Sequence, residues 1–464
     1  MKLPKYLFWL ETVKKIVWDP FWWVIFFLII LWIPFLRVWW WIFLPWMLQA
    51  QLKTIYKWYI NWDFDYAKGK WVVLEITPPR ELLVPIKAME DVYSVLWPIM
   101  DVANFREQWC DGELNNGPYW FSWEIASIEG KVHFYIRFMQ QHVSSAEMAL
   151  YAHYPDIEIR EVTDYVKLVP QTIPNEDWDM YGEDWDYYND DCFPIKTYEK
   201  FFEPQGERIS AEEKRIDPMI GLLEGLSRLG PGEHYWVQFI TDPIVEYDEP
   251  NVFKEAKKVI NKIAGRVEKK EPTLMEDLKK VAKELAMGPE KEGSGDSASF
   301  YWEEDEETGE KQISLTPGER EIITEVENKM KKPLYRTTIR AVYVAKRDAW
   351  KAPHRTLFRS YTSHFITNNL NSLNFKAETR PRIHFFWRKR RVFLRARKMF
   401  RNAVMRFPPL FPERMAEDLQ PIMSTEELAT LYHFPIRVSG MVSPTMGSVE
   451  SKKAGPPANL PIGE

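Results

Sequence analysis

The stretch YWFSWEIASIEGKVHFYIRFM, residues 119–139, decides the fold that the chain is expected to adopt. Both of its halves alternate in the way that is typical of strands with one buried face. Glu129-Gly130 joins them, and glycine permits the backbone conformations of a tight turn. The stretch therefore predicts a β-hairpin. Glu124, beside Trp123 on the first strand, is a candidate buried acid.

The segments that flank this hairpin predict a β-α-β-β-α-β order. WVVLEI (71–76) is β-rich and ends at two prolines. The helical pattern that follows has one apolar face, formed by Ile86, Met89, Val92, Tyr93 and Leu96. After the hairpin, Ser144 can cap a helix, and IEIREV (157–162) is typical of a strand. We therefore predict an α+β, ferredoxin-like domain over residues 71–165, with both helices on one face of its sheet.

A second ferredoxin-like domain is predicted over residues 193–375, beginning with FPIKTYEKFF. Asp217 can cap a helix that has Pro218 at its first position, and HYWVQFI (234–240) predicts a strand. Thr316 and Glu319 form a capping box, and the helix that they start leads into the strand YRTTIRAVYVA. Residues 251–312 between these elements are typical of a flexible insertion.

An acidic segment separates the two predicted domains. Residues 176–191 contain eight acids and no base. Its composition favours a solvated loop, and we expect residues 166–192 to be a linker that docks something basic.

The N-terminal residues 1–70 are predicted to anchor the chain in a membrane. FWWVIFFLIILWIPFLRVWWWIFLPWMLQAQL, residues 21–52, has one charge, Arg37. A helix over residues 18–36 is just long enough to cross a bilayer, while Pro34 and Pro45 could instead bend the run into a re-entrant hairpin. The expected membrane contacts are Trp22, Trp23, Phe26, Phe27, Trp32, Trp39, Trp40 and Trp41.

Composition agrees with a globular protein that carries such an anchor. The chain has 464 residues, of which 45% are hydrophobic, and this is enough for two or three domains. Only Cys110 and Cys192 are present, which gives no disulfide framework. We therefore expect a protein at the cell membrane with its remaining domains in the cytoplasm.

The C-terminal region, residues 376–464, begins with a basic stretch. Residues 380–406 contain eleven bases and no acid. Phe393, Ala396, Phe400 and Val404 fall on one face of a predicted helix, and basic side chains cover the remainder. The helix can lie on anionic lipid, on nucleic-acid phosphate or on an acidic partner, and the anchor favours lipid or partner. The predicted contacts are Arg388, Lys389, Arg390, Arg391, Arg395, Arg397, Lys398 and Arg401.

Motifs for catalysis are missing from the sequence. There is no G-x-x-x-x-G-K-[ST] loop for nucleotide phosphates and no H-E-x-x-H or G-x-S-x-G pattern. His133, His142 and His153 do not follow the spacing of zinc ligands. We therefore predict a protein that is not an enzyme and that needs no cofactor.

A resemblance to a known family comes from STEELATLYHFP, residues 424–435, in which Ser424 and Glu427 form a capping box. This helix and the Pro-rich tail after it resemble the region just before the motor domain of type IV secretion-like, conjugative DNA-transfer ATPases of the FtsK/HerA group, as found in candidate-phylum bacteria. Further segments resemble proteins that accompany these ATPases, namely LEITPPRE, KAME, WEIASIEGKVHFYIR, YAHYPDIEI, LTPGERE and TNNLNSL.

The resemblance implies a structural or coupling subunit of a DNA- or protein-translocating machine, with the motor ATPase in a separate chain. It also implies homo-oligomers around a hexameric motor. On this hypothesis the motor docks on Leu428, Leu431, Tyr432, His433 and Pro435. The alternative is a membrane-tethered protein that binds nucleic acid through residues 388–406.

Overall fold

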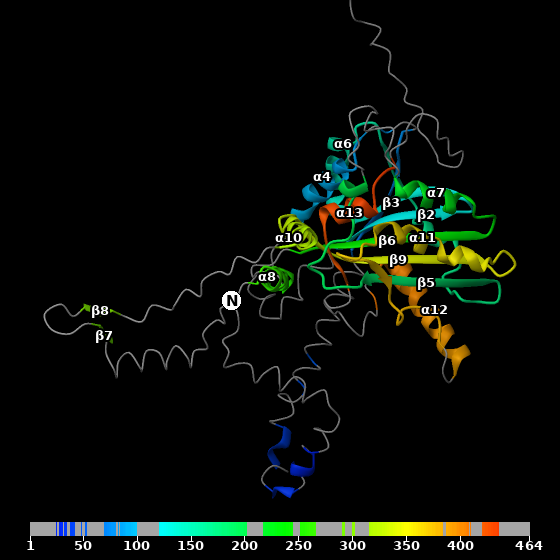
Figure 1. Cartoon of the computed structure of the whole chain (residues 1–464). Coiled ribbons are helices and arrows are strands. Elements are labelled where there is room, and N and C mark those ends of the chain that lie inside the picture. The colour runs from blue at the N-terminus through cyan, green and yellow to red at the C-terminus, as the bar shows by residue number, and fades with distance from the viewer. Residues whose placement is uncertain are drawn as a thin grey trace, which may run out of the picture.

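The computed structural model describes residues 69–99 apart from 80, 81 and 83, and then residues 120–201, 217–244, 251–265, 315–383, 387–407, 409 and 420–435. It also describes two short strands, β7 (Glu290–Glu292) and β8 (Ser299–Tyr301), and separate positions between 25 and 52. The main body is one antiparallel sheet with helices on both faces (Figure 1). Its strands are β1 (Trp71–Thr77), β2 (Phe121–Ile128), β3 (Lys131–Met139), β4 (Glu158–Val162), β5 (Trp178–Tyr187), β6 (Glu233–Pro243), β9 (Leu334–Lys346), β10 (Leu373–Phe375) and β11 (Ile422–Ser424).

The predicted hairpin is confirmed as β2 and β3. Ile128 is paired with Lys131, so the turn consists of Glu129 and Gly130. Both residues have positive φ, 52° and 85°, as the hairpin turn that matches strand twist requires. A side chain at position 130 would also collide with the backbone, because its Cβ would lie 2.5 Å from the carbonyl oxygen of Leu229.

The prediction of two separate ferredoxin-like domains is wrong, because the strands form a single nine-stranded sheet in the order β10-β5-β9-β6-β2-β3-β1-β4, with β11 also on β9. The element order over residues 71–162 is the predicted one, but β2 pairs with β6 from Phe121 to Ile128. This pairing satisfies backbone groups that two separate domains would leave exposed along their edge strands.

The prediction that residues 166–192 form a solvated acidic loop is also wrong. This segment contains the buried strand β5. Glu183 and Asp184 are each only 1% exposed. The chain neutralises both: Arg340 of β9 pairs with Asp184, and Arg359 pairs with Glu183. Sequence composition indicates charge, whereas these partners lie more than 150 residues away.

Five helices cover one face of the sheet. They are α4 (Lys87–Leu96), α6 (Val143–His153), α7 (Pro218–Ser227), α11 (Leu357–Thr362) and α13 (Thr425–Leu431). Alternate strand residues such as Trp123, Phe239 and Ile339 point into this main core, where they meet the helices. The predicted caps of α7 and α13 form, by Asp217 and by the Ser424–Glu427 capping box respectively.

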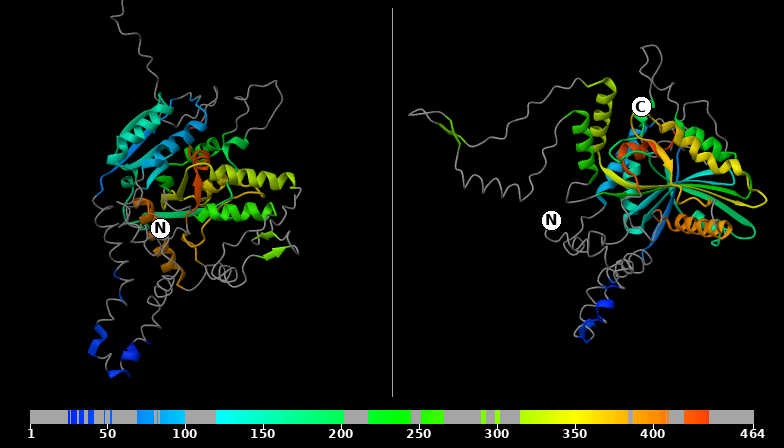
Figure 2. Two further views of the ribbon diagram at one scale, coloured as in Figure 1. Left: turned by 90° about the vertical axis from the view of Figure 1, so that its left-hand side faces the viewer. Right: turned by 60° about the horizontal axis from the view of Figure 1, so that its bottom comes forward.

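The opposite face carries one long helix, α12 (Arg388–Met405). Figure 2 shows it alone on its side of the sheet, with its first turns extending beyond the sheet. Its buried stripe is Ala396, Met399, Phe400 and Ala403, which pack on Trp236 and Val342. Gly182 of β5 allows this close approach, because a Cβ there would lie 2.7 Å from a Met399 side-chain carbon. Phe393, predicted to share the buried face, is 42% exposed.

A third apolar cluster joins α8 (Asn251–Ile263) to α10 (Pro317–Met330) at one end of the sheet. Val252, Ala256 and Val326 are its buried centre. The predicted capping box of Thr316 and Glu319 starts α10, with both reciprocal hydrogen bonds formed. Most of the insertion predicted over residues 251–312 lies outside the described residues.

The N-terminal prediction of a transmembrane or re-entrant anchor is not supported. Within the part of the chain that the structure describes, no helix is long and apolar enough to cross a membrane. Ile33 lies outside helical structure directly before Pro34, and a proline disfavours helical backbone in the residue that precedes it. Of the expected membrane contacts, Phe27, Trp32, Trp39, Trp40 and Trp41 are described as exposed, whereas Trp22, Trp23 and Phe26 lie outside the described residues.

Candidate functional site

A row of four polar side chains crosses the sheet beneath α12. Strand register places Glu124 of β2 opposite Gln238 of β6, Gln238 opposite Arg340 of β9, and Arg340 opposite Asp184 of β5. Each of the four is at most 1% exposed. We call these four residues the polar row. A buried polar group without a hydrogen-bond partner costs about 1–3 kcal/mol. For the polar row, α12 supplies several of these partners.

The polar row holds the last turn of α12 by its carbonyl groups. Arg340 Nη1 donates to the carbonyl oxygen of Asn402 at 2.8 Å, and Gln238 Nε2 donates to that of Ala403 at 3.0 Å. Both carbonyls lie in the last turn, where the negative end of the helix dipole favours a nearby cation, and the carbonyl of Asn402 also accepts the backbone N–H groups of Arg406 and Phe407. The sheet therefore fixes the C-terminal end of α12.

Arg406 completes this attachment from the helix side. Its guanidinium donates to both carboxylate oxygens of Glu124 at 2.9 and 3.0 Å, and to Asp164 at 2.7 and 2.8 Å. The side chains of Arg406 and Glu124 are fully buried. The predicted buried acid Glu124 is thus confirmed, and its partner lies 282 residues away.

The ionised states of this cluster stabilise one another. Burial alone would lower the pKa of Arg406, but Glu124 and Asp164 raise it well above its usual value. Burial would likewise raise the pKa of Asp164, but Arg406 holds it below its usual value. Arg406 also ends the helix in the left-handed conformation, with φ 55°, which is unusual for a residue with a side chain. The ion pairs offset that strain.

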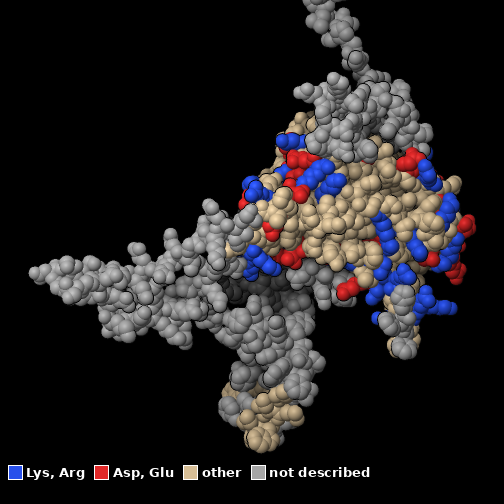
Figure 3. Space-filling model, viewed as in Figure 1, with Lys and Arg blue, Asp and Glu red and all other residues tan. Residues whose placement is uncertain are grey.

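The side of α12 that faces away from the sheet has a different environment. Figure 3 shows basic side chains gathered around this helix at the lower right of the molecule. Six of the eight predicted contacts are exposed, namely Arg388, Lys389, Arg390, Arg391, Arg397 and Arg401. Arg395 is half-buried and donates to the carbonyl oxygen of Arg380, and Lys398 is half-buried. No carboxylate among the described residues forms an ion pair with any of the six exposed cations. We call these six cations the basic end of α12.

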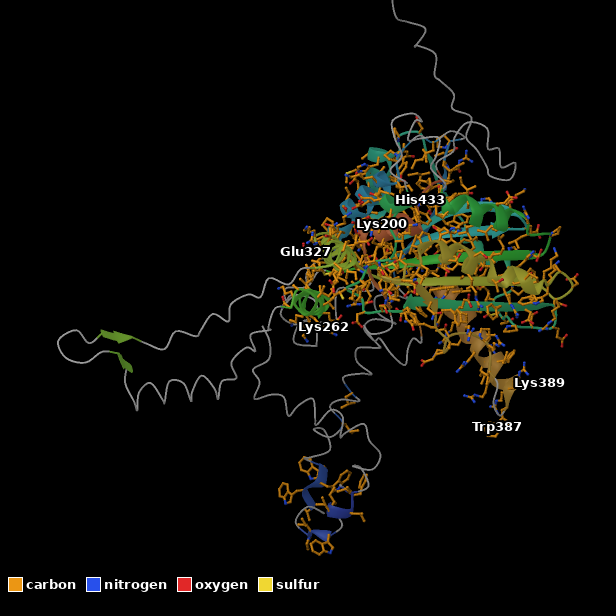
Figure 4. All side chains as sticks on the ribbon, viewed as in Figure 1. Lys200, Lys262, Glu327, Trp387, Lys389 and His433 are labelled. Carbon is orange, nitrogen blue, oxygen red and sulfur yellow. The ribbon has the colours of Figure 1, made fainter. Side chains whose placement is uncertain are left out.

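Sequence analysis missed Trp387, which directly precedes α12. Trp387 is 83% exposed and lies with Lys389 at the far end of the helix, away from the sheet (Figure 4). Phe393 and Leu394 are also exposed, at 42% and 52%. An aromatic residue at the start of an unbalanced run of bases was the available signal. Trp387 falls outside the helical spacing of Phe393, Ala396, Phe400 and Val404, so that pattern gives no information about it.

The residues of α13 and its C-terminal end that were predicted to dock a motor lie inside the fold. Leu428, Leu431 and Tyr432 are fully buried, His433 is 1% exposed, and Pro435 is buried. Tyr432 packs against Trp123, with ring centroids 5.4 Å apart. Short amphipathic helices pack on a core or on a partner by the same pattern, so the pattern did not distinguish the two.

Glu427 ties α13 to three other elements. It accepts hydrogen bonds from Tyr187 of β5 at 2.7 Å and from the backbone N–H of Ile195 at 2.9 Å, and it pairs with the buried Lys329 of α10 at 3.1 Å. The same carboxylate closes the capping box with Ser424. This helix is therefore a central structural element of the described body.

His433 forms a buried pair with Asp217, the N-cap of α7. Its Nε2 lies 3.0 Å from Asp217 Oδ1, and its Nδ1 lies 2.8 Å from the carbonyl oxygen of Ala429. Both ring nitrogens face acceptors, so only the protonated imidazole can donate to both. Burial would lower the pKa of His433, but Asp217 raises it above its usual value.

Metal binding has no candidate in the described part of the chain, where no three His, Cys, Asp or Glu side chains gather in a way that could hold an ion. Comparison with known proteins gives no further indication, since no family model and no curated protein matches the sequence. The resemblance to the region preceding a conjugative motor therefore stays a prediction.

Replacing Arg406 tests the attachment of α12. We expect Arg406→Met to lower the free energy of unfolding by about 3–5 kcal/mol, because Glu124 would keep a buried charge without its partner. The matched control is Arg401→Met, an exposed arginine on the same helix, which should change it by less than about 0.5 kcal/mol. Urea unfolding followed by circular dichroism measures both. Equal stability of the two variants would contradict the attachment.

Truncating Leu428 tests the position of α13. Leu428→Ala should cost about 2–5 kcal/mol, the usual result of opening a cavity in a core. Leu394→Ala, at a leucine that is 52% exposed, is the control and should be nearly neutral. An unchanged unfolding midpoint for Leu428→Ala would place the helix on the surface after all.

The His433–Asp217 pair should make stability depend on pH. Because the folded-state pKa of His433 lies above its unfolded value, its contribution is complete below about pH 6.5 and is lost as the pH rises through the folded pKa. The stability difference between wild type and His433→Gln should therefore be larger near pH 6 than near pH 9. His364→Gln, at an exposed histidine, is the control and should show no such trend. Thermal melts at several pH values measure the difference, and a gap that stays constant with pH would refute this account.

Proposed function

We propose that the protein binds nucleic acid through the basic end of α12. The observation that supports this proposal is a helix that is attached to the sheet at its C-terminal end and whose exposed side presents six cations without acidic partners among the described residues. Lysine and arginine side chains in such a cluster displace the counterions of a phosphate backbone, and the release of those ions provides most of the affinity for nucleic acid.

The position of the cations along the helix strengthens the argument. Arg388, Lys389, Arg390 and Arg391 occupy the first turn, which contains no acidic residue. The N-terminal end of a helix already carries a partial positive charge, so cations there repel it and one another. A phosphate chain would relieve this repulsion. The arrangement disfavours the isolated helix and favours its complex with a polyanion.

Net charge makes the attraction local. The whole chain has a net charge of −6, so it repels a polyanion at long range. At 0.15 M salt the Debye length is about 8 Å, so the cations of α12 dominate the field that a nearby phosphate experiences. The proposal therefore concerns this helix and not the surface as a whole.

An acidic protein partner is the alternative occupant of the same cations. The expectation that the chain couples a motor ATPase to a translocation machine stays a prediction, as does the expectation that it is not an enzyme. The residues proposed for motor docking are buried, so any such contact would have to use another surface. Phosphate contacts are the better fit to a dense run of arginines, because the guanidinium matches phosphate geometry with two parallel hydrogen bonds.

Removing four of the cations tests the proposal. We expect the variant Arg388→Gln, Arg390→Gln, Arg391→Gln, Arg397→Gln to bind oligonucleotides more weakly, with a salt dependence smaller by about 0.7–0.9 per lost phosphate contact. Fluorescence anisotropy between about 50 and 200 mM salt measures both effects.

The control variant changes four exposed lysines of other elements in the same way: Lys131→Gln, Lys167→Gln, Lys258→Gln and Lys262→Gln. It changes the net charge equally, so it should bind as wild type does. If both variants bound oligonucleotides equally weakly, overall charge would explain the loss, and a site on α12 would be contradicted. No binding by wild type at low salt would refute the proposed function.

A further inference from the structure

The basic end of α12 also presents apolar side chains, which phosphate contacts do not need. Trp387 directly precedes the helix and is 83% exposed, and Phe393 and Leu394 lie within the first two turns and are 42% and 52% exposed. Trp387 is more exposed than any other aromatic residue described after position 69. Single exposed apolar residues are common on proteins. Three of them need a reason where they lie among cations that have no acidic partner in the described part of the chain.

Helical spacing interleaves these side chains with the cations. Residues three or four apart share a face, so Arg390, Leu394, Arg397 and Arg401 form one exposed stripe, flanked by Phe393. Trp387 lies one turn before Arg391, whose N–H donates to the Trp387 carbonyl oxygen at 3.0 Å. Charged and apolar groups thus alternate at about one helical turn, or 5.4 Å.

Trp387 is also held in an unusual conformation. It is one of three residues other than glycine with positive φ, at 53°, in the described part of the chain. Among the described residues, Trp387 adds no side-chain cap to the helix, while its ring is open to solvent.

We infer that this site takes single-stranded nucleic acid with unpaired bases, an inference that rests on the proposed function. A duplex stacks its bases and offers phosphates and groove edges, so the apolar residues would find no partner on it. An unpaired strand offers both phosphates for the arginines and flat base faces for an aromatic ring. Stacking on aromatic side chains together with backbone contacts from cations is the usual chemistry of single-strand binding.

The test compares two labelled probes on the full-length protein: an oligodeoxythymidine of about 20 nucleotides and its duplex with oligodeoxyadenosine. Trp387→Ala should weaken binding of the single strand by about tenfold, whereas duplex binding should stay unchanged. Trp387→Phe should keep most of the single-strand affinity, because it keeps an aromatic face. Tyr188→Ala is the control, since Tyr188 is 72% exposed at a different place and should have no effect.

The possible failures are distinguishable. If wild type binds both probes and Trp387→Ala binds them as wild type does, the single-strand inference is overturned while nucleic-acid binding stands. Equal weakening on both probes also overturns it, because stacking cannot act on a closed duplex. If wild type binds neither probe at low salt, the proposed function itself fails.

Discussion

The polar row beneath α12 is the constraint on which the rest of the structure depends. Glu124, Gln238, Arg340 and Asp184 are brought together only when β2, β6, β9 and β5 pair in their observed register. A shift by one residue would turn every one of these side chains to the other face. Together with Arg406, the row attaches the last turn of α12 and leaves its first turns free. The register of these four strands thus determines both the continuity of the sheet and the position of the candidate site.

Local features of the fold were predictable from sequence because their causes are local. The hairpin at Glu129-Gly130 and the caps at Asp217, Thr316 and Ser424 need only residues within a few positions of one another. The single sheet was not predictable, because the pairing of β2 with β6 joins residues about 110 positions apart, and alternation specifies a buried face without naming the neighbouring strand. Strand β5 was hidden by its acids, whose neutralising arginines lie far along the chain.

The candidate site was predictable in part for the same reason. Composition located the basic stretch, and helical spacing located the helix. Whether an amphipathic helix packs on its own core or on a partner depends on what the remaining chain offers. Here the core accepts the apolar stripe of α12 and all of α13, so six cations of α12 are exposed and the apolar side of α13 is not. The most informative surface residue, Trp387, stands outside any periodic pattern. In a function based on α12, the sheet would hold the helix in place and the exposed side of the helix would contact the ligand.

The central claim is that nucleic acid contacts the exposed side of α12. Its most direct test is photo-crosslinking of the full-length protein to an oligonucleotide that contains 4-thiothymidine, followed by mass spectrometry of the crosslinked peptides. We predict crosslinks to peptides within residues 387–401. An excess of unlabelled oligonucleotide should prevent these crosslinks by competition. Crosslinks confined to other parts of the chain, such as the lysine-rich face of α8, would contradict the account.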